Sequence, residues 1–141
     1  MNIPEMLAHL KKTADQLDLP FGVRRMTFNS RRAQELGKWA EQSGVGEAFH
    51  SAVFDAYFAD GRNIALLPVL LGIVADIGGD PEEARSAIEE GRFKKAVDQD
   101  WQRSRSMGIT AVPTFVNNGR HLVGAQHYRD LARFISQGNG L

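Results

Sequence analysis

The most specific part of the sequence is Gly108-Ile109-Thr110-Ala111-Val112-Pro113-Thr114-Phe115-Val116. From Thr114 onward it is rich in β-branched and aromatic residues, which is typical of a strand. A proline directly before such a strand is unusual, because proline has no backbone N–H to donate to a β-ladder. A cis Val112–Pro113 bond would turn the chain sharply and point neighbouring backbone groups outward; a trans turn before an edge strand is the alternative. Since only about 5% of X–Pro bonds are cis, the dipeptide alone leaves both open.

The residues that follow predict a hairpin and a closing helix. Thr114–Asn117 and His121–Val123 are short β-prone runs, and the Asn118-Gly119 dipeptide between them accepts positive φ and favours a tight turn. An amphipathic helix is expected from about Gln126 to Gln137. One face of this helix carries the apolar side chains of Tyr128, Leu131, Phe134 and Ile135.

Helical periodicity dominates the first 107 residues. Helices are expected from Ile3 to Leu19, from a cap at Asn29 or Ser30 to Ser43, along Phe49–Phe58, along Leu66–Ile77, and in two segments after an Asp80 cap that Gly91 divides. The helix at Leu66–Ile77 is apolar around most of its girth, which indicates a central place in a bundle. Val23–Phe28 is short and suits an extended segment.

Residues 108–135, GITAVPTFVNNGRHLVGAQHYRDLARFI, resemble the C-terminal signature of the DsbA family of thioredoxin-fold proteins. The shared features are the Val-Pro-Thr-Phe sequence, the Asn-Gly hairpin, the Gly-Ala-Gln exit and the closing helix. Residues 17–64 and 80–93 resemble the helical insertion of this family, particularly of its FrnE-like branch. The resemblance covers essentially the whole chain. It implies an α+β fold, with a DsbA-type helical subdomain over residues 1–107 and the C-terminal β-β-α half of a thioredoxin-like fold over residues 108–141.

The resemblance also implies a thiol–disulfide oxidoreductase family and a substrate-binding site. In this family the cis-proline loop faces a reactive dithiol and offers backbone groups to a peptide or thiol ligand; here it corresponds to Thr110, Ala111, Val112 and Pro113. Gly124-Ala125-Gln126 matches the exit motif, whose expected role is to start the last helix. No catalytic residue, metal ligand or cofactor is expected in this chain.

The chain contains no cysteine, so it has no disulfide, thiolate ligand or cysteine nucleophile of its own. Family members carry a Cys-x-x-Cys motif at a helix N-terminus before the insertion, and no position here matches it. We therefore expect the chain to be catalytically incompetent alone. It is then either a truncated product or misassigned start of an oxidoreductase, or a non-catalytic peptide-binding or dimeric assembly protein. A relative of 2-hydroxychromene-2-carboxylate isomerase and kappa-type glutathione transferase is a third interpretation, disfavoured because that family's N-terminal hydroxyl residue has no match.

The implied half-fold predicts a homodimer. In a complete thioredoxin fold, the strand after the cis-proline pairs with the first strand of the domain. Without that strand, the Thr114–Asn117 edge has open donors and acceptors, and such an edge pairs readily with another chain. We therefore expect dimerisation through this edge across a two-fold axis. The competing solution is that Val23–Phe28 folds back as a covering strand.

Charge and hydropathy exclude several partners. The 17 basic and 17 acidic residues cancel, so no long-range field favours nucleic acid or anionic lipid. The basic pairs at residues 24–25, 31–32 and 94–95 are expected on solvated faces. The most apolar stretch, residues 64–77, is interrupted by Pro68, Gly72 and Asp76 and is shorter than the about 20 residues of a membrane span. The first residues lack a signal-peptide pattern. We expect a cytoplasmic protein without membrane or nucleic-acid partners.

We expect the histidine and aromatic residues to have mainly structural roles. The four histidines, at positions 9, 50, 121 and 127, have no metal-ligand spacing. The aromatic side chains of Phe49, Phe54, Tyr57, Phe58 and Trp101 are expected mainly in the core. The alternative is that they line a partner-binding groove between the helical part and the hairpin.

Overall fold

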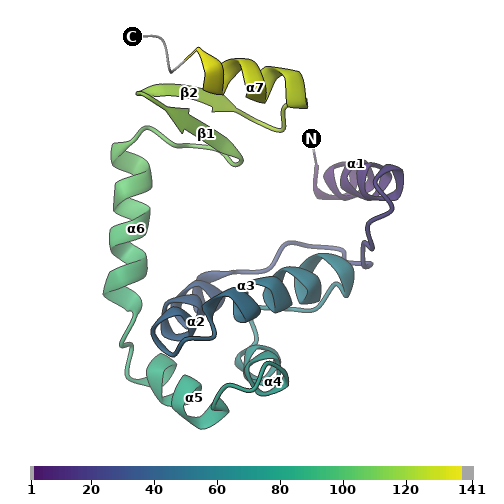
Figure 1. The fold of residues 1–141 in the computed structure, drawn as a ribbon. Helices are drawn as coiled ribbons and strands as arrows, with labels where there is room; N and C mark the ends of the chain where they lie inside the picture. The colour runs from purple at the N-terminus through teal and green to yellow at the C-terminus, as the bar shows by residue number, and fades with distance from the viewer. Residues whose placement is uncertain (1, 138–141) are drawn as a thin grey trace. The chain divides into compact units, whose positions relative to one another are not determined.

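The computed structural model describes residues 2–137. The chain forms two compact units, Met1–Asp98 and Gln99–Leu141, which Figure 1 shows as a mostly helical part followed by a hairpin and a last helix. The elements are α1 (Ile3–Gln16), α2 (Arg31–Gln42), α3 (Gly46–Phe54), the π-helix η1 (Asp55–Ala59), α4 (Leu67–Asp76), α5 (Pro81–Glu89), α6 (Lys94–Ser106), β1 (Thr114–Asn117), β2 (Arg120–Val123) and α7 (Tyr128–Ser136). This is the α+β fold that the sequence predicts. The two units divide within α6, and the boundary expected after residue 107 stays a prediction.

The core of the first unit lies where α2, α3, α4 and α5 meet. Its largest fully buried side chains include Leu36 and Trp39 of α2, Phe49 of α3, and Leu70 and Val74 of α4. Each such side chain contributes about 1.5–3 kcal/mol through the apolar surface that it removes from water. Helix α4 contributes the buried side chains of Leu70, Leu71, Ile73 and Val74 to this core, whereas Pro68, Ala75 and Asp76 on the same helix are exposed.

The start of α5 is determined by local sequence, whereas the end of α1 differs from its predicted place. The Asp80 side chain accepts hydrogen bonds from the backbone N–H groups of Glu82 and Glu83 at 2.9 and 3.2 Å, which caps α5 as expected. The prediction that the first helix reaches Leu19 was wrong. Helix α1 ends at Gln16, because Asp18 adopts a left-handed conformation (φ 53°) and the Leu19 N–H turns back to the Ala14 carbonyl.

The segment between α1 and α2 packs closely on the end of η1. The Gly22 N–H donates to the Phe58 carbonyl at 2.7 Å. A Cβ atom at Gly22 would come within 2.5 Å of the Gly61 backbone nitrogen, so only glycine fits at this contact. Within residues 2–137 the one sheet contains β1 and β2, and Val23–Phe28 does not form the covering strand considered above. It instead lies against η1 and the residue Gly61 that follows it: the Val23 carbonyl is close to Gly61, and the Phe28 ring meets Tyr57 edge-on.

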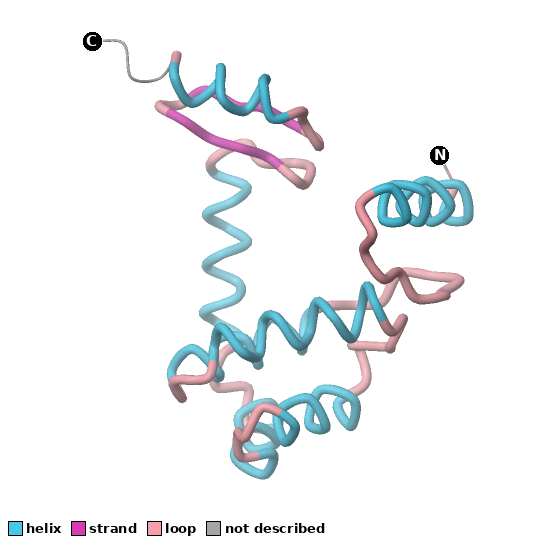
Figure 2. The backbone as a smooth tube through the Cα atoms, turned by 45° about the vertical axis from the view of Figure 1, so that its right-hand side comes forward, coloured by secondary structure: helices cyan, strands magenta, loops and turns pink. Residues whose placement is uncertain are grey.

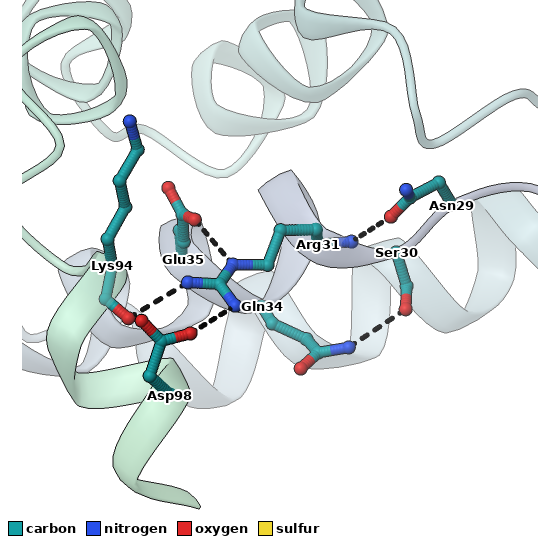
Figure 3. A network of polar contacts seen from close by, with 7 residues as sticks. All are labelled: Asn29, Ser30, Arg31, Gln34, Glu35, Lys94 and Asp98. Atoms are coloured by element: carbon teal, nitrogen blue, oxygen red, sulfur yellow. Dashed lines mark hydrogen bonds and ion pairs between the residues drawn. The ribbon is translucent and has the colours of Figure 1, made fainter. Parts of the chain in front are cut away.

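Two arginines expected on solvated faces are held by specific partners. Arg24 lies over the rings of Phe21, Tyr57 and Phe58, with its guanidinium carbon 5.0, 4.2 and 5.3 Å from the ring centroids. Figure 3 shows Arg31 between α2 and the start of α6, bonded to Glu35, Asp98 and the Lys94 carbonyl. The hydrogen bond to Asp98, and then that to Glu35, raise the pKa of Arg31. The sequence pattern missed the contacts to Tyr57, Phe58, Lys94 and Asp98 because these partners lie far away in the chain.

Three of the five aromatic residues assigned to the core are exposed. Phe49 is buried, but Phe54, Phe58 and Trp101 are 62%, 38% and 41% exposed. Phe54 comes five residues after Phe49, which places it about 140° around an α-helix and off the buried stripe. After Phe54 the helix widens into the π-turn of η1, in which the Asp60 N–H bonds to the Asp55 carbonyl, so the 3.6-residue period no longer applies. In α6 the buried stripe ends at Val97.

The second unit is built on a tight hairpin. Strands β1 and β2 are antiparallel, with Thr114 opposite Val123 and Asn117 opposite Arg120. Asn118 and Gly119 have φ values of 50° and 74°, the positive pair that a type I′ turn requires and that their sequence predicts. Figure 2 shows α7 lying along this hairpin. The Asn117 side chain donates to the carbonyls of Phe134 and Ile135 at 3.2 Å each, which ties β1 to the end of α7.

None of the helices within residues 2–137 combines the length and the apolar character that spanning a membrane requires.

Candidate substrate-binding loop

The four predicted site residues form one exposed loop between α6 and β1. Thr110, Ala111, Val112 and Pro113 are all exposed, and Val112 is 89% exposed. The Val112–Pro113 peptide bond is cis. The loop therefore presents backbone and small side chains to the surroundings, with no acid, base or nucleophile among its side chains other than the Thr110 hydroxyl.

Hydrogen bonds hold the loop at both ends. On the α6 side, Gly108 adopts φ 70° and its N–H bonds to the Arg105 carbonyl at 3.0 Å, while the Ile109 N–H bonds to the Ser104 carbonyl at 3.0 Å. This pattern closes the helix and directs the chain toward the hairpin. The His121 Nε2 atom also lies 2.8 Å from the Met107 carbonyl oxygen, which joins β2 to the end of α6.

On the hairpin side, the exit motif takes part in the loop. The Gly124 N–H donates to the Pro113 carbonyl at 2.8 Å, and the Thr114 hydroxyl donates to the Ala111 carbonyl at 2.6 Å. Sequence reasoning assigned Gly124 only to the start of the last helix. That helix begins at Tyr128, after an N-cap at His127, and Gly124 lies with φ 91° against the loop. A glycine that matches a motif and follows a strand is the signal that could have indicated this backbone contact.

In this hydrogen-bonded loop, both backbone groups of Val112 remain without a partner among the described residues. Within the described residues, neither the N–H nor the carbonyl of Val112 has a hydrogen-bond partner, while the carbonyls of its neighbours Ala111 and Pro113 are already used. A fixed donor and acceptor on one residue match the backbone of an extended peptide. No group of three or more potential metal ligands occurs within residues 2–137.

Next to the loop, β1 has an open edge. In the described part of the chain β1 pairs with β2 only. An apolar groove of about 480 Å³ lies between β1 and α7, lined by residues that include Phe115, Val116, Leu131 and Ile135. Phe115, Val116 and Ile135 are 37%, 39% and 58% exposed. An open edge flanked by apolar side chains is a surface that a further strand can cover.

The chain is similar to several known proteins. It is 27% identical over 88 residues to the uncharacterized protein YwbO of Bacillus subtilis (strain 168), which is 62% of this chain and 44% of that protein. It is similar in structure to a probable DsbA oxidoreductase, SCO1869, of Streptomyces coelicolor, with a TM-score of 0.82 and 24% identity over 98% of this chain and 62% of that one. The chain thus spans less than two thirds of the length of both.

Two further structures share the fold. One is a 2-hydroxychromene-2-carboxylate isomerase, with a TM-score of 0.80 and 16% identity over 96% of this chain and 66% of that one. The other is the cytosolic disulfide reductase DsbM of Pseudomonas aeruginosa, with a TM-score of 0.63 and 24% identity over 93% of this chain and 68% of that one. At these identities the likeness concerns the fold.

The model of the DSBA-like thioredoxin domain family matches residues 1–136. It includes both the helical insertion and the loop with its Val-Pro-Thr-Phe sequence, and thus the features on which the predicted resemblance depends. This chain belongs to the DSBA-like thioredoxin domain family.

Proposed function

We propose that this chain provides the substrate-binding part of a DsbA-like thiol–disulfide oxidoreductase, and that the loop Thr110–Pro113 binds an extended peptide or thiol substrate. The observation that carries the proposal is the open backbone of Val112 within an exposed loop that is hydrogen-bonded at both ends. A rigid donor–acceptor pair binds a peptide backbone with little loss of conformational freedom. Recognition by backbone groups also accepts many side-chain sequences, as a general dithiol enzyme requires.

The chain itself supplies no thiol. In this proposal the dithiol is on a separate polypeptide segment, and the loop holds the substrate's cysteine-containing backbone beside it. An insulin-reduction turbidity assay with this chain alone, in the presence of dithiothreitol, is therefore expected to match the no-protein control. A rate above that control would contradict the assignment of a purely binding role.

Peptide binding can be tested without redox chemistry. The probe is the blocked peptide acetyl-Ala-Cys-Ala-Val-amide with its cysteine S-methylated, titrated into ¹⁵N-labelled chain. Saturable shifts are expected at the amides of Val112 and Ala111. Val112→Pro removes the open N–H and is expected to weaken binding by about 5- to 10-fold, the value of one hydrogen bond. Val112→Ala keeps the N–H and is the matched control. Equal binding by the two variants, each shown to be folded by circular dichroism, would exclude backbone recognition at this residue.

Glutathione is a second candidate ligand for the loop. It is supported by the similarity of the fold to the isomerase and to DsbM, whose structure is also described with glutathione. This candidate predicts saturable binding of glutathione by calorimetry. The absence of heat at millimolar glutathione would discard it.

We also propose a homodimer formed by pairing of the open β1 edges, covering the groove beside α7. The exposed Phe115 and Val116 favour such coverage. Light scattering should give twice the 15.6 kDa chain mass. Val116→Lys places a charge on the paired surface and should shift the mass toward one chain, while Tyr128→Lys, at an exposed site on α7, serves as the control. A mass of one chain for the unsubstituted protein would rule out the dimer.

The remaining assignments are finer than the family. The residues of the helical insertion favour the FrnE-like branch of the family. We also propose that the chain is cytoplasmic. Fractionation of cells that express the native gene tests the second assignment, and recovery in an extracytoplasmic fraction would refute it.

A further inference from the structure

An aromatic pocket lies wholly within the first unit. It is formed by the segment before α2 together with α2, α3 and η1, and its volume is about 350 Å³. Sites for small molecules commonly have volumes of about 300–1,000 Å³ and are lined by apolar and aromatic groups with a few polar ones. Residues of the loop 110–113 take no part in this pocket.

The pocket wall is a set of rings in fixed contact. Phe28 meets Tyr57 edge-on, with centroids 6.2 Å apart, and Phe54 stacks on Phe58 at 6.0 Å with an interplanar angle of 14°. The Arg24 guanidinium, 4.2 Å from the Tyr57 centroid, supports the same rings. Since Phe54 and Phe58 are nevertheless 62% and 38% exposed, the stacked pair presents a large apolar surface to solvent. A ligand that covers this surface would remove it from water.

One part of the pocket is polar. Ser30 and Gln34 line it, and the Gln34 Nε2 atom donates to the Ser30 Oγ atom at 2.8 Å, as Figure 3 shows. Within the described residues, the Ser30 hydroxyl proton has no acceptor. A hydroxyl that accepts one bond and has a proton to donate can bind an oxygen atom of a ligand.

The His50 ring, which also lines the pocket, is held in place by its neighbours. Its Nε2 atom lies 3.2 Å from Glu41 Oε1. A Cβ atom at Gly37 would come within 2.9 Å of His50 Cε1, so the glycine in the middle of α2 makes room for the ring. Glycine at this position has a lower helix propensity than alanine would have.

We propose that this pocket binds an uncharged, planar aromatic molecule of about two fused rings that carries one hydroxyl or keto oxygen. Stacked and edge-on rings match a planar aromatic guest. An uncharged guest is favoured because His50 is paired with Glu41 and no lysine, arginine, aspartate or glutamate lines the pocket. A peptide is disfavoured because most of the wall is helical, so a buried peptide backbone would leave polar groups unsatisfied. The proposal is independent of the function assigned to the loop.

The test uses 2-naphthol and decahydro-2-naphthol, which share a carbon skeleton and a hydroxyl but differ in aromaticity. Methyl ¹³C–¹H spectra of the whole chain are recorded during titration. With 2-naphthol we expect saturable shifts at the methyls of Val53 and Ile64, which line the pocket, and none at Leu131 of the second unit. For a ligand of this size the dissociation constant should be about 1 mM or lower. Decahydro-2-naphthol should bind about 3- to 10-fold more weakly.

Substitutions test separately how the aromatic rings, the Ser30 hydroxyl and the space of the pocket contribute to binding. Phe54→Ala removes an exposed ring and should weaken 2-naphthol binding by about 3- to 10-fold, while Tyr128→Ala, which removes an exposed ring outside the pocket, should leave it unchanged. Ser30→Ala should weaken binding of 2-naphthol but not of naphthalene. Val53→Phe should fill the pocket and abolish both. Each variant is first shown to unfold at the temperature of the unsubstituted chain, within a few degrees.

Three results would each overturn the proposal. Equal affinity for 2-naphthol and decahydro-2-naphthol would indicate an unspecific apolar surface. Unchanged binding by Phe54→Ala would place the ligand elsewhere. Tighter binding of N-acetylphenylalanine amide than of 2-naphthol, with shifts at the same methyls, would identify a peptide-binding site instead.

Discussion

The guanidinium of Arg31 and the carboxylate of Asp98 lie 2.6 Å apart (Nη1–Oδ1), although 67 positions separate them in the chain. The Arg31 Nε atom donates to Glu35 at 2.6 Å, on the other side of the same guanidinium. The two acids differ in burial, since the side chain of Glu35 is 5% exposed and that of Asp98 is 63% exposed. Arg31 thus neutralises a buried carboxylate of α2 while it links that helix to α6.

Substitution of Arg31 is expected to destabilise the first unit more than substitution of Asp98. Arg31→Met leaves the buried Glu35 carboxylate without its cation, whereas Asp98→Asn removes an ion pair whose acid is mostly solvated. The midpoint of thermal unfolding, followed by circular dichroism, should fall clearly for Arg31→Met and only slightly for Asp98→Asn. The double variant Arg31→Met/Glu35→Leu should recover part of the loss. Equal midpoints for the two single variants would show that the buried pair has no special role.

Two glycine-to-alanine changes, at Gly22 and at Gly72, are expected to have opposite effects on the free energy of unfolding. Gly22→Ala places a Cβ 2.5 to 2.7 Å from three backbone atoms of residues 59–61, and should lower the free energy of unfolding by about 1–3 kcal/mol. Gly72→Ala, inside α4, meets only the flexible end of Arg62 at 3.8 Å and should raise it by about 1 kcal/mol through helix propensity. Urea denaturation measures both. The prediction fails if Gly22→Ala is neutral.

Phe54 and Phe49 belong to the same residue type but differ in burial, so their alanine variants form a matched comparison. Phe49 is 1% exposed, and Phe49→Ala should cost about 3–5 kcal/mol of unfolding free energy. Phe54→Ala removes a 62% exposed ring and its stacking on Phe58, and should cost only about 1 kcal/mol. Chemical denaturation of the two variants under the same conditions compares them. Similar losses would mean that Phe54 is covered in solution.

The Asn118-Gly119 turn predicts a specific intolerance to β-branched residues. Asn118 has φ 50°, which costs a β-branched residue about 1–2 kcal/mol, so Asn118→Val should destabilise the hairpin by that amount. Asn118→Gly should be nearly neutral. Amide hydrogen exchange at β1 and β2 reports the local stability of the hairpin. Equal exchange rates in the two variants would contradict the turn assignment.

Much of the fold could be predicted because its signals are local. Asn118-Gly119 requires only its own two positive φ values, and the Asp80 cap requires only the next three residues. The candidate loop Thr110–Pro113 was instead implied by the family resemblance of residues 108–135, and its role in binding a substrate stays a prediction. The hydrogen bond from Gly124 to Pro113 was missed because it joins residues on opposite sides of a hairpin.

The burial of the aromatic side chains could not be predicted from helical periodicity. Phe54 and Phe58 were expected in the core together with Phe49, but Phe54 lies off the helical stripe, the helix changes to a π-turn at Asp55, and both rings are exposed. No short stretch of sequence announces this change. The pocket that these rings form with Phe28 therefore could not be predicted either.

The amino-acid sequence alone was sufficient for the α+β class, the Asp80 helix cap, the hairpin and the family, and for the absence of any thiol in the chain. These properties depend on residue types and on backbone preferences over a few neighbouring positions. The neutralisation of Glu35 by Arg31, the close contact of Gly22 with Gly61, the open backbone of Val112 and the aromatic pocket required the three-dimensional structure. Each depends on which distant groups approach within hydrogen-bonding or van der Waals distance, and packing of the whole unit determines those approaches.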